Sequence, residues 1–197
     1  MNIDVIPAVA LFAFVSSITP GPNNLMLMAS GANFGFVRTI PHMLGISIGF
    51  LVLMALTGLG LAQVFDSYPI SHLILKVASV LYMLWLAWKI ANAAPAESQA
   101  ATGTPMSFLQ AAAFQWVNPK AWAMALTAVT VYVGTTSSAP LILACVIFSA
   151  INLPSVGVWT VLGQQMARIL TNQRRLTLFN RTMALLLIAS LYPVLQS

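Results

Sequence analysis

The sequence predicts an all-α, polytopic membrane protein whose six transmembrane helices form two inverted repeats of three helices. Three observations lead to this fold class. The composition is strongly apolar, six apolar segments follow one another along the chain, and proline interrupts the first segment of each half. The first and fourth helices are therefore expected to be broken at proline.

The composition excludes a soluble protein. Hydrophobic residues make up 59% of the 197 residues and charged residues 6%, with a mean hydropathy of +0.90, whereas a soluble domain carries roughly 25% charged residues. The lipid bilayer is therefore the expected environment. The net charge of +5 comes from basic residues at the edges of spans, whose distribution predicts the orientation in the membrane. It does not indicate nucleic acid as a partner. A single cysteine, Cys145, excludes a disulfide framework or a cysteine metal cluster.

A membrane span needs about 20 mostly apolar residues, and the chain is read as one membrane domain over residues 1–197. The stretch MNIDVIP has no positive segment and no A-x-A site follows it, so the first apolar segment is not read as a cleaved signal peptide. The expected spans are Val5–Phe34, Thr39–Val64, Ile70–Asn92, Phe108–Val133, Pro140–Ala167 and Thr182–Val194.

A polar, proline-containing loop at about 93–106 divides the chain into halves of about 1–92 and 107–197. Each half has three spans, so the two halves have opposite orientations, as in many transporters. Six of the eight Lys and Arg residues flank the connectors of one side. The positive-inside rule places that side in the cytoplasm and both termini in the periplasm of a bacterial inner membrane.

The first break is the run Pro20, Gly21, Pro22, Asn23 and Asn24 inside the first span. Proline frees backbone carbonyls, which survive at membrane depth only inside protein or beside a wet cavity. The helix is expected to stop and to restart at Pro22, where the missing N–H does no harm. The positive end of the restarted helix then lies beside the two asparagines.

The second break is Asn118, Pro119 and Lys120 in the fourth span. Asn118 is expected to cap the restarted helix and Pro119 to open it. Two such helix N-termini around a midplane cavity form an anion site suited to a carboxylate.

Lys120 falls about 12 residues, or roughly 18 Å, into its span and so near the bilayer centre. A lysine there costs about 2.5–3.5 kcal/mol and by default indicates function. Two interpretations stay open at this point. Lys120 meets the cargo or the coupling ion, or it is a structural residue satisfied by carbonyls freed at Pro119. No carboxylate lies in any span, so Lys120 and His42 are the candidates for moving a proton, with a solvated His42 near the cytoplasmic surface as the plainer alternative.

Two further polar or small motifs lie in other spans. Asn152, two residues before Pro154 in the fifth span, either accompanies a packing kink or offers a polar group to the same cavity. Gly45 and Gly49 in the second span have the spacing of close helix packing. Homodimerisation through small-residue faces is an additional option.

The motifs TPGPNN at Thr19–Asn24, WLAWKIA at Trp85–Ala91 and NPKAW at Asn118–Trp122 resemble the LysE/RhtB family of amino-acid exporters. The resemblance covers nearly the whole chain and is greatest for the cysteine/O-acetylserine exporter group. It implies export of a neutral or polar amino acid, driven by the proton gradient. It also implies that the residues of both breaks line or shape the transport site.

The expected function is secondary transport of an amino acid, of the cysteine or O-acetylserine type or of the homoserine or threonine type, out of the cytoplasm by alternating access, with no cofactor and no metal. Export of another small solute, an organic anion or a metal, is the alternative, although buried carboxylate and histidine clusters for a divalent metal are missing. An intramembrane enzyme is disfavoured, because the spans hold no Ser/His/Asp set or paired carboxylates.

Overall fold

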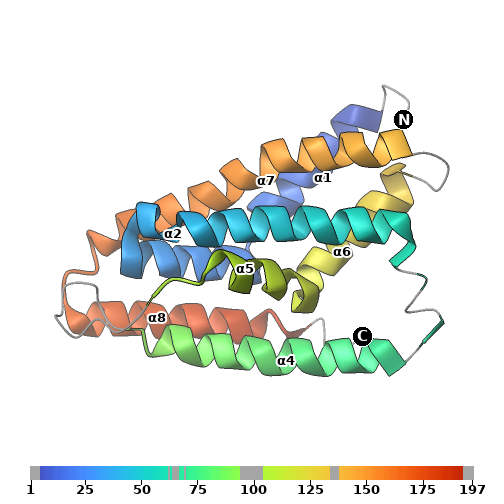
Figure 1. The fold of residues 1–197 in the computed structure, drawn as a ribbon. Helices are drawn as coiled ribbons and strands as arrows, with labels where there is room; N and C mark the ends of the chain where they lie inside the picture. The colour runs from blue at the N-terminus through green and yellow to red at the C-terminus, as the bar shows by residue number, and fades with distance from the viewer. Residues whose placement is uncertain are drawn as a thin grey trace.

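The computed structural model describes residues 5–61, 63, 67–68, 70–93, 104–133 and 138–192, and every regular element in these ranges is a helix. The helices form an elongated bundle (Figure 1), which confirms the all-α prediction. The elements in chain order are α1 (Ile6–Ile18), α2 (Pro22–Leu56), the π-helix η2 (Thr57–Leu61), α4 (Ile70–Ala91), α5 (Phe108–Phe114), the 3-10 helix η3 (Gln115–Val117), α6 (Pro119–Thr127), the π-helix η4 (Ala128–Val133), α7 (Ser138–Ala167) and α8 (Gln173–Ala189).

The helix α2 doubles back on itself at Gly35. This residue has φ 78° and ψ 171°, a combination that is essentially restricted to glycine. The hydroxyls of Ser30 and Thr39 lie 2.9 Å apart across the turn, so the segments before and after Gly35 run antiparallel (Figure 1). The first two expected spans, Val5–Phe34 and Thr39–Val64, leave residues 35–38 as the predicted connector. In the structure a single residue makes this connection, because the positive φ of Gly35 reverses the chain and the helix resumes at Phe36.

Three helices in the described ranges are long and apolar enough to cross a membrane: Pro22–Leu61, which contains the Gly35 turn, Leu73–Ala91 and Ser138–Ala167. Large apolar side chains are exposed along the outer helices, among them Leu81 on α4 (64%) and Leu185 on α8 (66%), as a lipid-facing surface requires. The architecture is consistent with a polytopic membrane protein. The count of six spans and the inverted repeat stay predictions.

One prediction about an individual span needs correction. The sixth span was expected to begin at Thr182, but α8 begins at Gln173, because the Asn172 side chain caps the helix by accepting from the backbone N–H of Arg175 at 2.9 Å. In the fifth span, Pro154 lies inside α7, which continues through it. The central loop at 93–106 lies largely outside the described residues.

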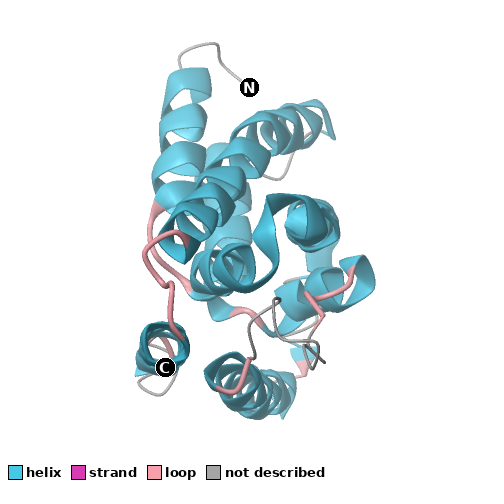
Figure 2. Cartoon of the chain, turned by 90° about the vertical axis from the view of Figure 1, so that its left-hand side faces the viewer, coloured by secondary structure: helices cyan, strands magenta, loops and turns pink. Residues whose placement is uncertain are grey.

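Helices from the first half of the chain pack mainly on helices from the second half. The helix α2 packs mainly on α7 and α5, and α4 packs on α8. Figure 2 shows α4 and α8 nearly end-on and next to each other at the lower edge of the bundle. Glycine permits the close approaches. A Cβ on Gly163 would lie 2.0 Å from the Met28 carbonyl oxygen, and a Cβ on Gly49 would lie 2.6 Å from Cα of Ala112. The packing role predicted for Gly45 and Gly49 is confirmed.

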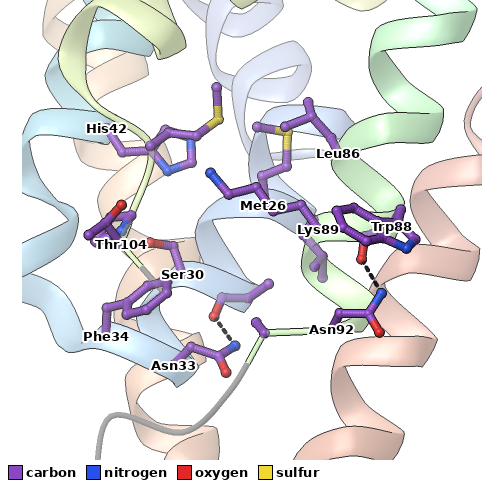
Figure 3. Close-up of a pocket in the computed structure, with 15 residues that line it drawn as sticks. Met26, Ser30, Asn33, Phe34, His42, Leu86, Trp88, Lys89, Asn92 and Thr104 are labelled. Atoms are coloured by element: carbon purple, nitrogen blue, oxygen red, sulfur yellow. Dashed lines mark hydrogen bonds between the residues drawn. The ribbon is translucent and has the colours of Figure 1, made fainter. Parts of the chain in front are cut away.

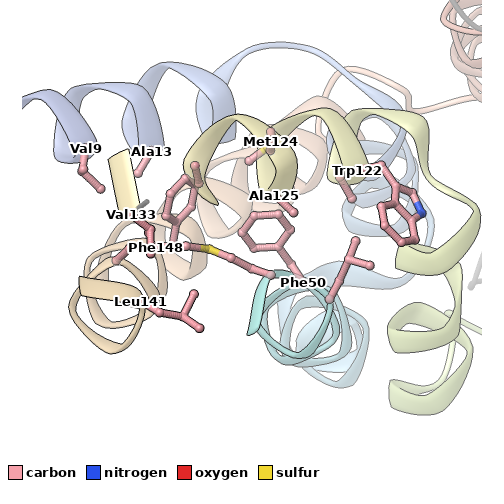
Figure 4. Packing of buried hydrophobic residues seen from close by; sticks show 14 residues of the cluster. Val9, Ala13, Phe50, Trp122, Met124, Ala125, Val133, Leu141 and Phe148 are labelled. Carbon is pink, nitrogen blue, oxygen red and sulfur yellow. The ribbon is translucent and has the colours of Figure 1, made fainter. Parts of the chain in front are cut away.

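The largest buried apolar cluster holds α1, α6 and α7 around the C-terminal part of α2 (Figure 4). Phe50 and Phe148 form its centre, with ring centroids 5.3 Å apart, and Val9, Ala13 and Ala125 are buried around them. The cluster holds α1 and α6 against the same part of α2. The breaks predicted from the sequence lie where α1 ends and where α6 begins.

Candidate functional site

The two proline breaks meet through Lys120. Its ammonium donates hydrogen bonds to the carbonyl oxygen of Thr19 at 2.8 Å, to the Thr19 hydroxyl at 3.0 Å and to the carbonyl oxygen of Pro20 at 3.3 Å. Lys120 and Thr19 are 101 residues apart in the chain. A charged side chain from one half therefore pairs with the free carbonyls at the helix break of the other half.

The first break is an extended segment between two helices. The helix α1 ends at Ile18, and α2 begins with Pro22 as its first residue after an extended Gly21 with φ −177°, as predicted. Any residue can adopt this φ, so the requirement for glycine is spatial. A Cβ on Gly21 would lie 2.6 Å from Cδ of Lys120, and its absence makes room for the lysine side chain.

The second break is capped as the sequence predicts. The Asn118 side chain accepts a hydrogen bond from the backbone N–H of Lys120 at 3.1 Å, and Pro119 is the first residue of α6. Lys120 consequently sits in the first turn of α6, directly beside the end of α1. Cations are stabilised at the C-terminal end of a helix, where the macrodipole is negative.

The last carbonyls at the end of α1 are paired: the Ser16 carbonyl accepts from the Thr19 hydroxyl at 3.2 Å, and those that follow accept from side chains of other segments. Asn24 donates to the carbonyls of Ser17 and Thr19, both at 2.8 Å. The indole of Trp159 on α7 donates to the carbonyl of Ile18 at 3.0 Å. Lys120 completes the set. The carbonyls that satisfy the lysine thus belong to the first break and not to Pro119, where the sequence analysis placed them for a structural role.

A pair of buried amides connects the start of α2 with the end of α5. Asn23 donates to the side-chain oxygen of Gln115 at 2.8 Å, and Gln115 donates back at 3.2 Å and to the carbonyl of Ala111 at 2.9 Å. Gln115 is fully buried. Sequence reasoning missed it, although a glutamine in an apolar span three residues before the second break was a usable signal.

Asn152 belongs to the same polar region. Its side chain accepts from the Ser47 hydroxyl at 3.0 Å and donates to the Ser17 hydroxyl at 3.2 Å. This contact joins α7 to α1 and to the second segment of α2. Of the two interpretations left open for Asn152, the structure agrees with the polar group in the cavity. Ser17, Ser47 and Trp159 carry no sequence motif and were not predicted.

These residues surround a cavity of about 20 Å³, enough for on the order of one water molecule. The three prolines shape its backbone and do not line it. Six of the nine residues predicted for the site line this cavity: Gly21, Asn23, Asn24, Asn118, Lys120 and Asn152.

A second, larger cavity of about 210 Å³ lies beside the Gly35 turn, between α2, the end of α4 and residues 104–106 (Figure 3). His42 lines it and is only 2% exposed, with no hydrogen-bond partner on either ring nitrogen. The alternative of a solvated His42 at the membrane surface is therefore wrong. The residues around His42 differ in exposure: Val37 (76%) and Ile40 (37%) are exposed, whereas Thr39 and His42 are buried.

Comparisons with known proteins agree with the motifs. The family model described as LysE type translocator matches residues 14–191. The "Cysteine/O-acetylserine efflux protein" of Escherichia coli O139:H28 is 31% identical over 183 residues, covering 90% of each chain, and the protein of the same name from Escherichia coli K12 is 30% identical over the same coverage. The one from Salmonella typhimurium is 35% identical over 123 residues, or 62% of each chain. No solved structure matches this chain significantly.

The match to the family model spans both breaks and every helix that contributes to the polar cavity. The chain therefore belongs to the family of LysE-type translocators, which are membrane transporters and not enzymes.

Proposed function

We propose that this protein exports a small amino acid of the cysteine or O-acetylserine type from the cytoplasm by alternating access, with the inward proton gradient as the driving force. The names of the relatives support the substrate class, and the apolar helices support a position in the bacterial inner membrane. The observation that carries the proposal is the ammonium of Lys120, which is held by the carbonyls of a broken helix beside a polar cavity.

The proposed transport unit is the single domain 1–197. Its halves, about 1–92 and 107–197, move against each other, and the loop at 93–106 joins them on the cytoplasmic side. Both termini are then periplasmic. Arg38 follows the Gly35 turn, and Arg168 and Arg174 flank the α7–α8 connection. The turn and the connection lie at the same end of the bundle (Figure 1), and the positive-inside rule makes that end cytoplasmic.

The substrate site is proposed at the two breaks. The backbone N–H groups of Asn23 and Asn24 lie in the first turn of α2 and have no partner within that helix. These N–H groups form the positive end of α2, which faces the cavity and can bind a carboxylate. The side chains of Asn23, Asn24, Asn118 and Asn152 supply further donors and acceptors, and Pro20, Gly21, Pro22 and Pro119 hold the backbone in place.

Lys120 occupies the position where a substrate ammonium group would bind. In the resting protein its own ammonium is held by the carbonyls of Thr19 and Pro20. We expect the α-ammonium group of the amino acid to replace it there, while Lys120 turns to the substrate carboxylate. The substrate ammonium thus replaces the Lys120 ammonium as the donor to these carbonyls, so no carbonyl is left without a donor in the low-dielectric interior.

The exchange needs an opening of the site, because a cavity of about 20 Å³ is too small for an amino acid. Opening separates α1 from α6 and therefore breaks the contact between Lys120 and Thr19. Binding of substrate and separation of the two breaks are thus coupled, which is what alternating access requires.

The test is amino-acid efflux from cells that overproduce the protein. Medium from these cells and from cells with empty vector is profiled by mass spectrometry, with protein abundance in the membrane measured in parallel. We expect cysteine or O-acetylserine to accumulate in the medium and the accumulation to stop when an uncoupler removes the proton gradient. A protein that is abundant in the membrane but raises no amino acid in the medium would refute the proposal.

A further inference from the structure

We propose that the 210 Å³ cavity beside the Gly35 turn is a second binding site, which receives the zwitterionic amino acid before it reaches Lys120. The identity of the ligand rests on the proposed function, but the site itself rests on three polar groups that face this cavity. They are the imidazole of His42, the ammonium of Lys89 and the hydroxyl of Ser30.

His42 is the first of these groups. Its side chain is 2% exposed, and both ring nitrogens lack a hydrogen-bond partner. A buried polar group is nearly always paired, and leaving it unpaired is unfavourable. The ring lines the cavity and faces its interior (Figure 3). A neutral imidazole offers one donor and one acceptor to a ligand there.

Lys89 is the second group. A lysine near the end of a span normally extends its ammonium to the membrane surface. Lys89 instead extends across the cavity with its ammonium toward His42 (Figure 3). The ammonium lies 5.4 Å from the centroid of the Trp85 ring, and no carboxylate faces it within the part of the chain that the structure describes. A ligand carboxylate is the group that this ammonium would bind.

Ser30 supplies the complementary acceptor. The Thr39 hydroxyl donates to the Gly35 carbonyl at 2.8 Å, so it cannot also donate to Ser30. In the 2.9 Å contact between the two hydroxyls, Ser30 must therefore be the donor. The Ser30 oxygen keeps lone pairs that can accept from a ligand ammonium. A donor at Lys89 and an acceptor at Ser30 fit the two charged groups of one amino acid.

The size and place of the cavity agree with this ligand. The cavity is roughly ten times larger than the one at the breaks, about 210 Å³ against about 20 Å³, and its lining is mostly apolar with few polar groups, as small-molecule sites are. Met26 lines it, and Asn23 lines the smaller cavity. These residues are three positions apart on α2, hence neighbours on one helix face. The paired amides of Asn23 and Gln115 therefore stand next to the boundary between the two cavities.

The test measures how a substrate protects a cysteine placed in the cavity. In full-length protein with Cys145→Ala, reconstituted in nanodiscs, Thr104→Cys is the reporter because Thr104 lines the cavity and is exposed. Thr171→Cys is the matched control, since it is exposed at the same end of the bundle and does not line the cavity. The rate of modification by N-ethylmaleimide is followed with increasing O-acetyl-L-serine.

We expect O-acetyl-L-serine to slow the modification of the cysteine at 104 and not of the cysteine at 171. Lys89→Gln should raise the half-protecting concentration by about tenfold to a hundredfold, the loss expected for a hydrogen bond to a charged group, and Lys89→Arg should restore most of it. His42→Leu should also weaken protection, whereas His42→Gln, which keeps a donor and an acceptor, should preserve it.

Protection must persist in a Lys120→Met background, because the second site does not use Lys120. Loss of protection in that background, or equal protection of both cysteines, would overturn the second site. Absence of protection in a protein that exports amino acids normally would overturn it as well and leave the proposed function intact. Protection without export of any amino acid would support the site and refute the export function.

Discussion

Replacement of Lys120 by methionine is the most direct test of the transport mechanism. Methionine has a similar length and no charge, so it removes the hydrogen bonds to Thr19 and Pro20 with little change of volume. The Thr19 carbonyl keeps Asn24 as a donor at 2.8 Å, whereas the Pro20 carbonyl loses the donor that Lys120 supplies. The damage to the fold is thus limited to one carbonyl.

The effect on stability follows from two opposing contributions. The three hydrogen bonds that the ammonium donates are worth about 1.5–3 kcal/mol each, so their loss destabilises the protein by about 4.5–9 kcal/mol. Removal of a charge from the membrane interior stabilises it by about 2.5–3.5 kcal/mol. The net destabilisation is therefore about 1–6.5 kcal/mol. We expect Lys120→Met to reach the membrane and to melt at a moderately lower temperature.

The effect on transport should be much larger. Without the ammonium, no group holds the substrate carboxylate while the substrate ammonium binds at the break. Efflux of labelled O-acetyl-L-serine, normalised to protein abundance in the membrane, is expected to fall to the level of the empty vector. Lys76→Met on α4 is the control, because Lys76 does not line the polar cavity, and it should export normally. Normal export by Lys120→Met at equal abundance would remove Lys120 from the mechanism.

Three further predictions concern the architecture, with thermal unfolding in detergent as the measurement. Gly35→Ala should destabilise the protein by about 1–3 kcal/mol, because alanine is strained at φ 78° and ψ 171°; an unchanged melting temperature would refute the turn. Gly163→Ala should lower the melting temperature, since its Cβ would lie 2.0 Å from a backbone carbonyl of α2 and would force α2 away from α7. Gly157→Ala is the control, because its Cβ would meet only a methionine methyl at 3.5 Å, and it should melt like the wild type. Asn23→Leu should destabilise by about 1–3 kcal/mol because it leaves the side-chain oxygen of the buried Gln115 without the donor that Asn23 supplies. The double variant Asn23→Leu/Gln115→Leu should be less destabilised than the sum of the single variants; strict additivity would contradict the coupling.

Local features of the sequence account for much of the fold. Proline and glycine act on the backbone within one or two residues, so the ends at Ile18 and Pro22 and the cap at Asn118 were predictable from their own neighbourhoods. The start of α8 was missed, because the arginines near Gln173 looked like a connector, although Asn172 provides a helix cap there.

The sequence by itself determined that the chain is helical and apolar and that two helices are interrupted around a central lysine. It could not say what that lysine contacts, because an ammonium finds its partners through space and Thr19 is 101 residues away. The same holds for Gln115 and for His42, whose burial depends on how the Gly35 turn folds the second segment of α2 back along the first. Only the tertiary structure decided these contacts, since hydrogen bonds between residues 92 and 101 positions apart depend on helix packing and not on local sequence.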